Sequence, residues 1–228
     1  MTIIVEFNLL SKKIHHRTII DCVTFKLVQG EVTTLIGQNG SGKTTIAKVM
    51  LGQETYTSGQ CIVKDNIRIG YIPQKLDTSF NMPITSKLLL EILSPGGINN
   101  DLIDLETFVG YSRIQHKDIS SISGGELQKL LISGTLMSKP DLLILDEPTQ
   151  FLDVTSQQEF YKILGECKEK FGITIFMISH DLFTIMKNSD QVICLNGKVC
   201  CTGKLTDIET NSDFKNALSE IGVYLHNH

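Results

Sequence analysis

The stretch that most restricts the fold is a glycine-rich segment at residues 37–45, between two apolar runs. The run at 32–36 has the length and composition of a buried strand, and the run at 46–51 has the apolar face of a helix. A strand, a glycine loop and a helix in this order are typical of a phosphate-binding P-loop, because the glycines let backbone N–H groups turn toward an anion at the helix start. The segment predicts nucleotide binding by Gly37, Gln38, Asn39, Gly40, Ser41, Gly42, Lys43, Thr44 and Thr45.

Three side chains at the end of this segment have separate expected tasks. Lys43 can reach the outer phosphates, the hydroxyl of Thr44 suits Mg²⁺, and Thr45 is placed to help hold the inner phosphates. A chance glycine-rich turn is the alternative, and the flanking strand and helix patterns argue against it.

The composition indicates a folded protein and excludes several functional classes. The chain has 228 residues, of which 41% are hydrophobic and 20% charged, and its formal net charge is -4. This balance gives no general attraction to nucleic acid, so no nucleic-acid partner is expected. No apolar run approaches the roughly 18 residues that cross a bilayer, and no signal peptide is evident, so we expect a cytosolic chain.

Six cysteines are scattered along the chain without a paired C-x-x-C spacing, so we expect them to be reduced thiols. A thiolate metal site is the alternative, and the adjacent Cys200 and Cys201 are its only indication. The cysteines are Cys22, Cys61, Cys167, Cys194, Cys200 and Cys201.

The part of the chain around the glycine segment is rich in predicted strands. Residues 2–7 and 18–28 favour an antiparallel pair that leads into the P-loop strand, with the basic, polar residues 11–17 between its strands. Residues 61–63 and 67–72 are predicted as a second hairpin, which turns at an Asp-Asn pair.

Between residues 75 and 139 the pattern becomes helical. Leucines and isoleucines recur at helical spacing over 86–93 and 101–109, which indicates an inserted helical lobe. Near its end, Ser123 has the character of an N-cap, and the glycines after it leave N–H groups free to meet an anion.

Two adjacent carboxylates, Asp146 and Glu147, follow the fully apolar strand at 142–145, at the end where ligands bind in parallel α/β sheets. Carboxylates beside apolar strands are costly without a cation, so Asp146 is expected to hold Mg²⁺ and Glu147 to face the attacking water. Gln74 and His180 also stand at the exits of apolar strands.

The last third of the chain is predicted to alternate between helices and strands. An amphipathic helix over 155–170 precedes a buried strand over 173–178. A hairpin joins 191–195 to 198–201 around an Asn-Gly turn, and a short helix follows from residue 212.

These motifs together resemble the nucleotide-binding subunit of an ATP-binding-cassette (ABC) transporter, over nearly the whole chain and in the family's order. The resemblance implies an α/β fold: a P-loop NTPase core with an antiparallel β subdomain and an inserted α-helical lobe. One ABC ATPase domain would span 1–228, with the core at 1–75 and 139–228 and the lobe at 76–138. The matching motifs are Walker A at 37–45, the Q-loop Gln74, the signature Ser123-Gly124-Gly125-Glu126, Walker B at 142–147, the D-loop at Leu152-Asp153 and the switch histidine His180.

The family resemblance also implies a mechanism that uses ATP and Mg²⁺. Two copies would work as a head-to-tail homodimer, in which Ser123, Gly124 and Gly125 of one copy close over the γ-phosphate of the ATP held by the other. Glu126 and Asp153 are also expected among the nucleotide-binding residues. Glu147 would polarise the attacking water, and His180 would contact the γ-phosphate. Gln74 would sense Mg²⁺ and water, joining Thr44 and Asp146 around the metal.

The sequence departs from the family at the base site and in the signature. The aromatic residue on which the family commonly stacks adenine is absent, and Ile14 stands in its place, with His15 and His16 as alternative stacking partners. In the signature, Ile122 replaces the usual leucine and Glu126 the usual glutamine.

Within the family, residues 68–76, 147–150 and 194–203 look like the ATP-binding subunits of bacterial zinc importers, and the last three residues, 226–228, echo a histidine-containing tail. This resemblance implies an integral-membrane permease, an extracytoplasmic metal-binding protein, and a peripheral location on the cytoplasmic face of the inner membrane. A manganese or iron importer ATPase is one alternative. A non-transport ABC ATPase that drives assembly of another complex is the second.

Overall fold

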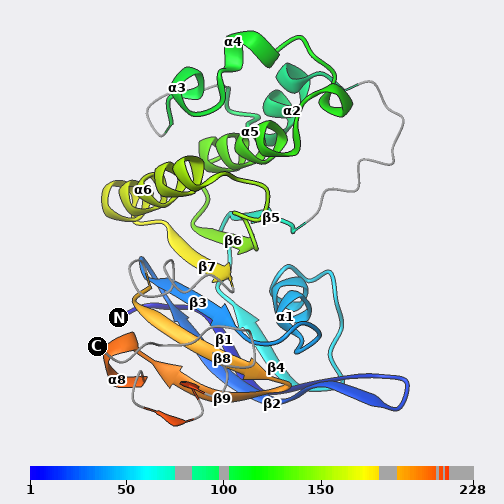
Figure 1. Ribbon diagram of the computed structural model, residues 1–228. Coiled ribbons are helices and arrows are strands. Elements are labelled where there is room, and N and C mark those ends of the chain that lie inside the picture. The colour runs from blue at the N-terminus through cyan, green and yellow to red at the C-terminus, as the bar shows by residue number, and fades with distance from the viewer. Residues whose placement is uncertain (75–83, 98–102, 180–188, 209–210, 213, 216–228) are drawn as a thin grey trace. The chain divides into compact units, whose positions relative to one another are not determined.

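The computed structural model describes residues 1–74, 84–97, 103–179, 189–208, 211–212 and 214–215. The chain divides into two compact units, each with its own elements (Figure 1). The first unit is formed by Met1–Ile67 with Thr174–His228, and the second by Arg68–Ile173. The predicted division into a core and a lobe at residues 76 and 138 stays a prediction.

An antiparallel sheet in the first unit contains β1 (Ile3–Ile14), β2 (Arg17–Val28) and β4 (Ser58–Val63), in the order β2-β1-β4. The predicted antiparallel pair is confirmed, but the separation of its strands by residues 11–17 is wrong, because β1 extends to Ile14 and β2 begins at Arg17. The strands continue to a two-residue turn, with His15 at φ 53. The pairing of β1 with β2 has several register shifts along its length. Within β1, Lys12 Nζ forms an ion pair with Oε1 of Glu54 at 2.6 Å.

The buried part of the first unit is built around β3 (Val32–Ile36), which lies between β7 (Thr174–Ile178) and β8 (Gln191–Asn196) and runs parallel to both. All residues of β3 and β7 are buried, as expected of parallel strands. Stacked rings join this part to the antiparallel sheet, because Phe25 lies between Phe7 and Phe176, with ring centroids 4.5 and 6.3 Å away.

The second unit combines two parallel strands with the helices. β5 (Ile69–Ile72) pairs with β6 (Leu142–Asp146), and α5 contacts α2, α3 and β5. Ser123 caps α5, as predicted. The helices are α2 (Ser86–Leu93), α3 (Leu105–Val109), α4 (Tyr111–Ile114), the 3₁₀ helix η1 (Ile119–Ser121), α5 (Gly124–Met137) and α6 (Val154–Phe171).

One predicted hairpin is wrong, although its turn exists. β4 pairs with β1 in the first unit, whereas β5 pairs with β6 in the second. Asn66, at φ 59, turns the chain between them, so the Asp-Asn signal marks a passage between units and not a tight hairpin. The predicted helix over 86–93 and the hairpin of β8 with β9 (Lys198–Gly203) are confirmed. The predicted tail helix from 212 falls mostly outside the described residues, and α8 (Leu205–Ile208) precedes it.

The β8–β9 hairpin also corrects the expectation that all six cysteines are reduced. Cys194 and Cys201 are paired partners in the two strands, and they form a disulfide with their Cα atoms 5.1 Å apart. Facing positions on antiparallel strands bring the two Cβ atoms within bonding reach of a disulfide. The spacing of seven residues therefore indicates a pair only when the hairpin register is known.

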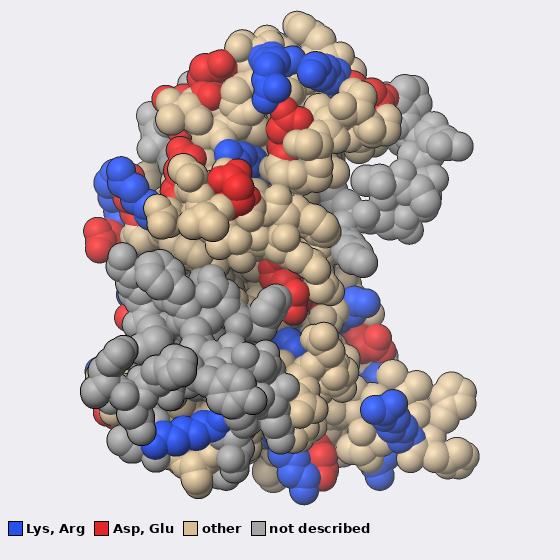
Figure 2. Space-filling view, in the orientation of Figure 1, with Lys and Arg blue, Asp and Glu red and all other residues tan. Residues whose placement is uncertain are grey.

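Charged side chains of both signs intermingle on the face drawn in Figure 2. In the second unit, Arg68 forms an ion pair with Asp141, and Lys170 forms one with Glu166. Among the described residues, the helices are too short or too polar to span a membrane.

Candidate nucleotide site

The P-loop forms the predicted turn between β3 and α1 (Lys43–Met50) in the first unit. Gly42 takes a left-handed conformation, φ 100, at the N-cap of α1, and no side chain caps this helix. Lys43 is buried, and its Nζ donates to the carbonyls of Gly37 at 2.8 Å and Gln38 at 2.9 Å. The lysine ammonium is thus folded over the loop, at the uncapped helix start where an anion is stabilised.

The loop fits a bound phosphate chain in its polar groups. The Oγ of Ser41 is buried and has no hydrogen-bond partner among the residues that the structure describes. A buried hydroxyl without a partner is unfavourable, and a phosphate oxygen would supply one. Thr44 and Thr45 follow in the first turn of α1 and are only partly buried, while Gln38, Asn39 and Gly40 are exposed at the tip of the loop.

The β8–β9 hairpin supports the P-loop from one side. The amide of Gly197, at the hairpin turn, donates to the carbonyl of Ser41 at 3.3 Å. The carbonyl oxygen of Leu195 lies 2.0 Å from the point where a Cβ on Gly37 would stand. The start of the P-loop therefore has no room for any side chain, which explains the need for glycine at residue 37.

In the second unit, Asp146 and Glu147 lie at the end of β6, as predicted, and Gln74 lies just after the neighbouring strand β5. Asp146 is 2% exposed, and Glu147 has the left-handed φ of 49. The Nε2 of Gln74 donates to Oε2 of Glu147 at 3.1 Å. A left-handed conformation in a non-glycine residue is strained, and such strain is concentrated at functional sites.

The buried environment of this strand end also affects a neighbouring tyrosine. Burial, with the nearby Asp146 carboxylate as a second cause, raises the pKa of Tyr71 to about 12. The phenol is therefore neutral at physiological pH and adds no second negative charge beside Asp146.

The signature segment begins α5 through a capping box. Ser123 Oγ accepts from the amide of Glu126 at 3.2 Å, and Glu126 Oε2 accepts from the amide of Ser123 at 2.8 Å. Glu126 also forms an ion pair with Arg113. These contacts lower the pKa of Glu126, chiefly through the bond from the Ser123 amide, against an opposing effect of burial. Ser123 and Gly124 remain exposed, so a rigid segment presents free surface.

The D-loop lies against this signature within the second unit. The carbonyl of Phe151 is 3.1 Å from the position of a Cβ on Gly125, and the Phe151 side chain is 47% exposed. Asp153 caps α6 by accepting from the amide and hydroxyl of Ser156 at 2.9 and 2.8 Å. Both bonds, the amide's first, lower the pKa of Asp153.

Two second-unit residues that the sequence analysis missed support these motifs. Gln128 is buried in α5 and donates from Nε2 to the carbonyl of Pro148 at 3.0 Å, which ties the signature helix to the loop after β6. Arg113 holds Glu126 from α4. The sequence offered no clear signal for Gln128, because α5 also contains other polar residues such as Lys129 and Ser133, and it offered none for Arg113.

In the part of the chain that it describes, the structure does not place the other residues singled out from the sequence beside these motifs. His180 lies outside the described residues, as do the last three residues of the chain, 226–228. Ile14 is 47% exposed at the tip of β1, next to the turn formed by His15 and His16, and the structure gives it no ring partner among the described aromatic contacts.

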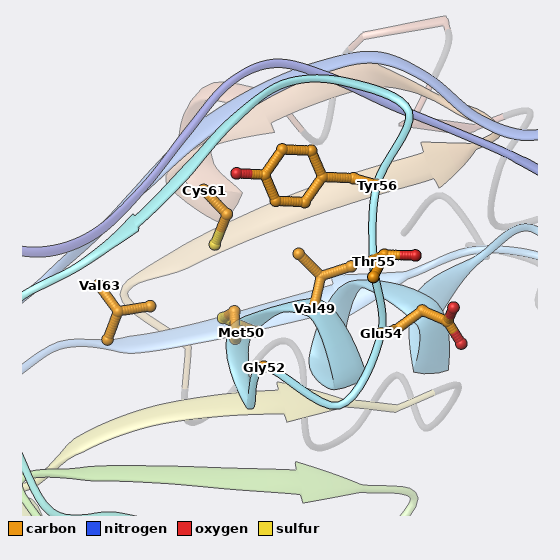
Figure 3. A pocket seen from close by; sticks show the side chains of 8 residues that line it. All are labelled: Val49, Met50, Gly52, Glu54, Thr55, Tyr56, Cys61 and Val63. Atoms are coloured by element: carbon orange, nitrogen blue, oxygen red, sulfur yellow. The ribbon is translucent and has the colours of Figure 1, made fainter.

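A cavity of about 490 Å³ opens at the C-terminal end of α1, away from the P-loop end of the helix (Figure 3). Its lining is mostly apolar, and burial raises the pKa of the Cys61 thiol there to about 11. This cavity lacks the phosphate-binding features of the P-loop and is a separate feature of the first unit. Its lining residues are Val49, Met50, Gly52, Glu54, Thr55, Tyr56, Cys61 and Val63.

Solved structures share this fold over nearly the whole chain. An ATP-binding subunit of an ABC transporter superposes with a TM-score of 0.83 at 25% identity, covering 96% of this chain and 99% of that one. A bacterial ABC transporter cassette solved as a dimer superposes with a TM-score of 0.74 at 21% identity, covering 88% of this chain and 98% of that one.

Sequence relatives agree with the fold. A zinc import ATP-binding protein ZnuC of Rickettsia bellii is 52% identical over 99% of this chain and 97% of its own length. The ZnuC protein of Vibrio cholerae is 37% identical over 94% of this chain and 81% of its own length. The family model described as ABC transporter matches residues 20–150. The chain therefore belongs to the ABC transporter family, among the ATP-binding subunits of the ZnuC group.

Proposed function

We propose that this chain hydrolyses ATP to energise the import of a divalent metal ion, zinc, through a partner membrane permease. The hydrogen bond between Gln74 and Glu147, beside the buried Asp146, carries the ATPase part of the proposal. It combines a carboxylate, an amide and a strained backbone at the end of an apolar strand, which suits the positioning of an attacking water. The relatives named as zinc import ATP-binding proteins support zinc as the cargo.

The P-loop would bind the phosphates of ATP. Lys43 would exchange its bonds to the Gly37 and Gln38 carbonyls for phosphate oxygens, and Ser41 would gain the partner that its buried hydroxyl lacks. Thr44 and Asp146 have the hydroxyl and carboxylate oxygens that Mg²⁺ prefers. When bound, Mg²⁺ would neutralise charge on the outer phosphates.

Glu147 would act as the general base toward the attacking water. Gln74 holds one of its carboxylate oxygens and would orient it, and it would respond when the metal and water arrive. His180 would contact the γ-phosphate, as the family resemblance implies. Each of these roles predicts loss of turnover without loss of ATP binding when the side chain is changed.

Two copies of the chain would complete each other's sites. The signature residues Ser123, Gly124 and Gly125 present an exposed, capped helix start, which favours an anion such as the γ-phosphate of a nucleotide held by the other copy. Glu126 fixes that start, and Asp153 belongs to the adjoining D-loop surface. A cassette of the same fold was solved as a dimer, which supports the assembly of two copies.

The proposal includes further partners and a location. The permease would span the membrane, an extracytoplasmic metal-binding protein would deliver the cargo, and this chain would attach to the cytoplasmic face of the inner membrane. The permease would dock on the segment 75–93, which lies partly outside the described residues.

Metal uptake in cells tests the whole proposal. A strain that carries this chain or its Glu147→Gln variant as the only copy would be measured for uptake of zinc, manganese and iron. We expect the variant to lose zinc uptake selectively. If the variant lost manganese or iron uptake and kept zinc uptake, the transported metal would be manganese or iron and not zinc. If no uptake fell and no permease co-purified, a non-transport assembly ATPase would replace the transporter.

A further inference from the structure

The β8–β9 hairpin gathers three cysteine sulfur atoms outside the nucleotide motifs. The Sγ atoms of Cys194, Cys200 and Cys201 all lie within 4.8 Å of one another, the only such group of possible metal ligands among the described residues. Cys194 and Cys201 are buried, whereas Cys200 is exposed. The group therefore has two ligands inside the protein and one at the surface.

A β-bulge explains how two adjacent cysteines can reach the same partner. Neighbouring residues on a regular strand point to opposite faces of the sheet. Here Cys194 pairs with Cys201 while Leu195 pairs with Val199, so Cys200 is an extra residue opposite the same part of β8. A bulge of this kind re-aims a side chain, and the Cys200 thiol donates to the carbonyl of Cys194 at 3.3 Å.

We propose that, once the Cys194–Cys201 disulfide is reduced, Cys194, Cys200 and Cys201 bind a thiophilic d¹⁰ cation of the Zn²⁺ type. Zinc–thiolate bonds of about 2.3 Å place sulfur atoms about 3.8 Å apart, so the three sulfurs need only small movements, with Cys194 and Cys201 separating. The exposed Cys200 provides the entry path, and a water completes a four-coordinate ion.

The chemistry balances with a dithiol as the reductant. Two electrons and two protons from the dithiol convert the disulfide to two thiols, and the dithiol becomes a disulfide. Zn²⁺ then replaces the protons of three thiols, which gives a tris-thiolate of charge minus one and three released protons. The disulfide seen in the structure is the closed form of the site.

The site has a direct structural route to the P-loop. Cys194 and Leu195 are neighbours in β8, and Leu195 packs its carbonyl against Gly37. Between the two strands of the hairpin, Gly197 donates to the carbonyl of Ser41. Reduction of the disulfide and binding of the cation would therefore both occur within the hairpin that supports the P-loop.

Cobalt binding to the full chain tests the proposal. The protein would be reduced with dithiothreitol, freed of reductant under argon, and titrated with Co²⁺ without nucleotide, and then with Zn²⁺. We expect one equivalent of Co²⁺ with a thiolate-to-cobalt charge-transfer band that Zn²⁺ abolishes. Cys200→Ser, at an exposed position, should weaken Zn²⁺ binding by at least about tenfold, because it removes a ligand.

Matched variants locate the ion. Cys22→Ser and a double change of His226 and His228 to Ala should leave the band unchanged, and oxidised wild-type protein should lack it. An absent band in the reduced protein, or a band that Cys200→Ser leaves at full strength, would overturn the proposal. A signal that disappears with the tail histidines would do the same. None of these outcomes bears on ATP hydrolysis, so the proposed function stands or falls separately.

Discussion

Gln74 donates a hydrogen bond from Nε2 to Oε2 of Glu147, over 3.1 Å and a sequence separation of 73 residues. Parallel pairing of β5 with β6 brings the two strand ends together, and the left-handed Glu147 holds its carboxylate there. The amide thus fixes one carboxylate oxygen of Glu147, which is the arrangement expected of a general base with a positioning partner.

Glu147→Gln should abolish turnover while it preserves ATP binding. Glutamine keeps the volume and hydrogen bonding of the side chain but cannot accept a proton, so kcat should fall by about 10²–10⁴-fold. Steady-state hydrolysis and equilibrium binding of a labelled ATP separate the two effects. Glu159→Gln, on α6, provides a carboxylate control that should retain turnover. Turnover close to wild type in Glu147→Gln would remove Glu147 from the catalytic role.

Gly37→Ala should destabilise the first unit more than Gly40→Ala. A Cβ at residue 37 would lie 2.0 Å from the carbonyl oxygen of Leu195, an overlap that forces backbone movement and costs about 1–3 kcal/mol or more. At residue 40 no atom lies within 4 Å, so only the φ of 81 opposes a side chain, at about 1–2 kcal/mol. Urea unfolding of both variants measures the difference, and equal midpoints would contradict the steric explanation.

Ser123→Ala should lower stability through the loss of a helix cap. The hydroxyl oxygen accepts from the Glu126 amide, and removal of such an N-cap costs about 1 kcal/mol. Ser123→Thr keeps an acceptor and serves as the control. A thermal melt of the alanine variant that overlays the wild type would show that the cap contributes little to the folded state.

The capping box also predicts a pH dependence. Folding lowers the pKa of Glu126 from its ordinary 4.5. The contribution of its carboxylate to the free energy of unfolding is therefore fully present above that value and is lost as the pH falls through the lower folded pKa. Glu126→Gln should therefore be less stable than wild type at about pH 7, and the gap should close as the pH falls below the ordinary pKa of 4.5. Unfolding midpoints against pH test this, and a constant gap would assign the difference to the neutral hydrogen bonds alone.

The P-loop and the strand ends could be predicted because their signals are local. Gly37 to Thr45 carries its own spacing, and Asp146 and Glu147 directly follow four apolar residues. The contact between Gln74 and Glu147 could not be found from the pattern of residues alone, since it depends on which strands pair. The family resemblance supplied that grouping.

The errors have the same physical origin. The polar residues 11–17 are expected from the sequence to separate the two strands, but the strands continue through 11–14 and from 17, and Lys12 within β1 forms an ion pair with Glu54. The turn at Asn66 is real, but β4 finds its partner in β1. The pairing of Cys194 with Cys201 depends on the hairpin register and the bulge at Cys200, neither of which the spacing of cysteines reveals.

Cys61 should react with iodoacetamide slowly near pH 8 and much faster near pH 10. Burial raises its pKa to about 11, so the thiolate fraction grows about a hundredfold over that range. Cys167, whose pKa burial also raises to about 11, is 1% exposed in α6 and should stay slow at both values, because the reagent cannot reach it. The exposed Cys22 should be labelled before Cys61 and Cys167. Peptide mass analysis of timed samples measures all three, and rapid labelling of Cys61 at the lower pH would show that the cavity beside α1 does not desolvate its thiol.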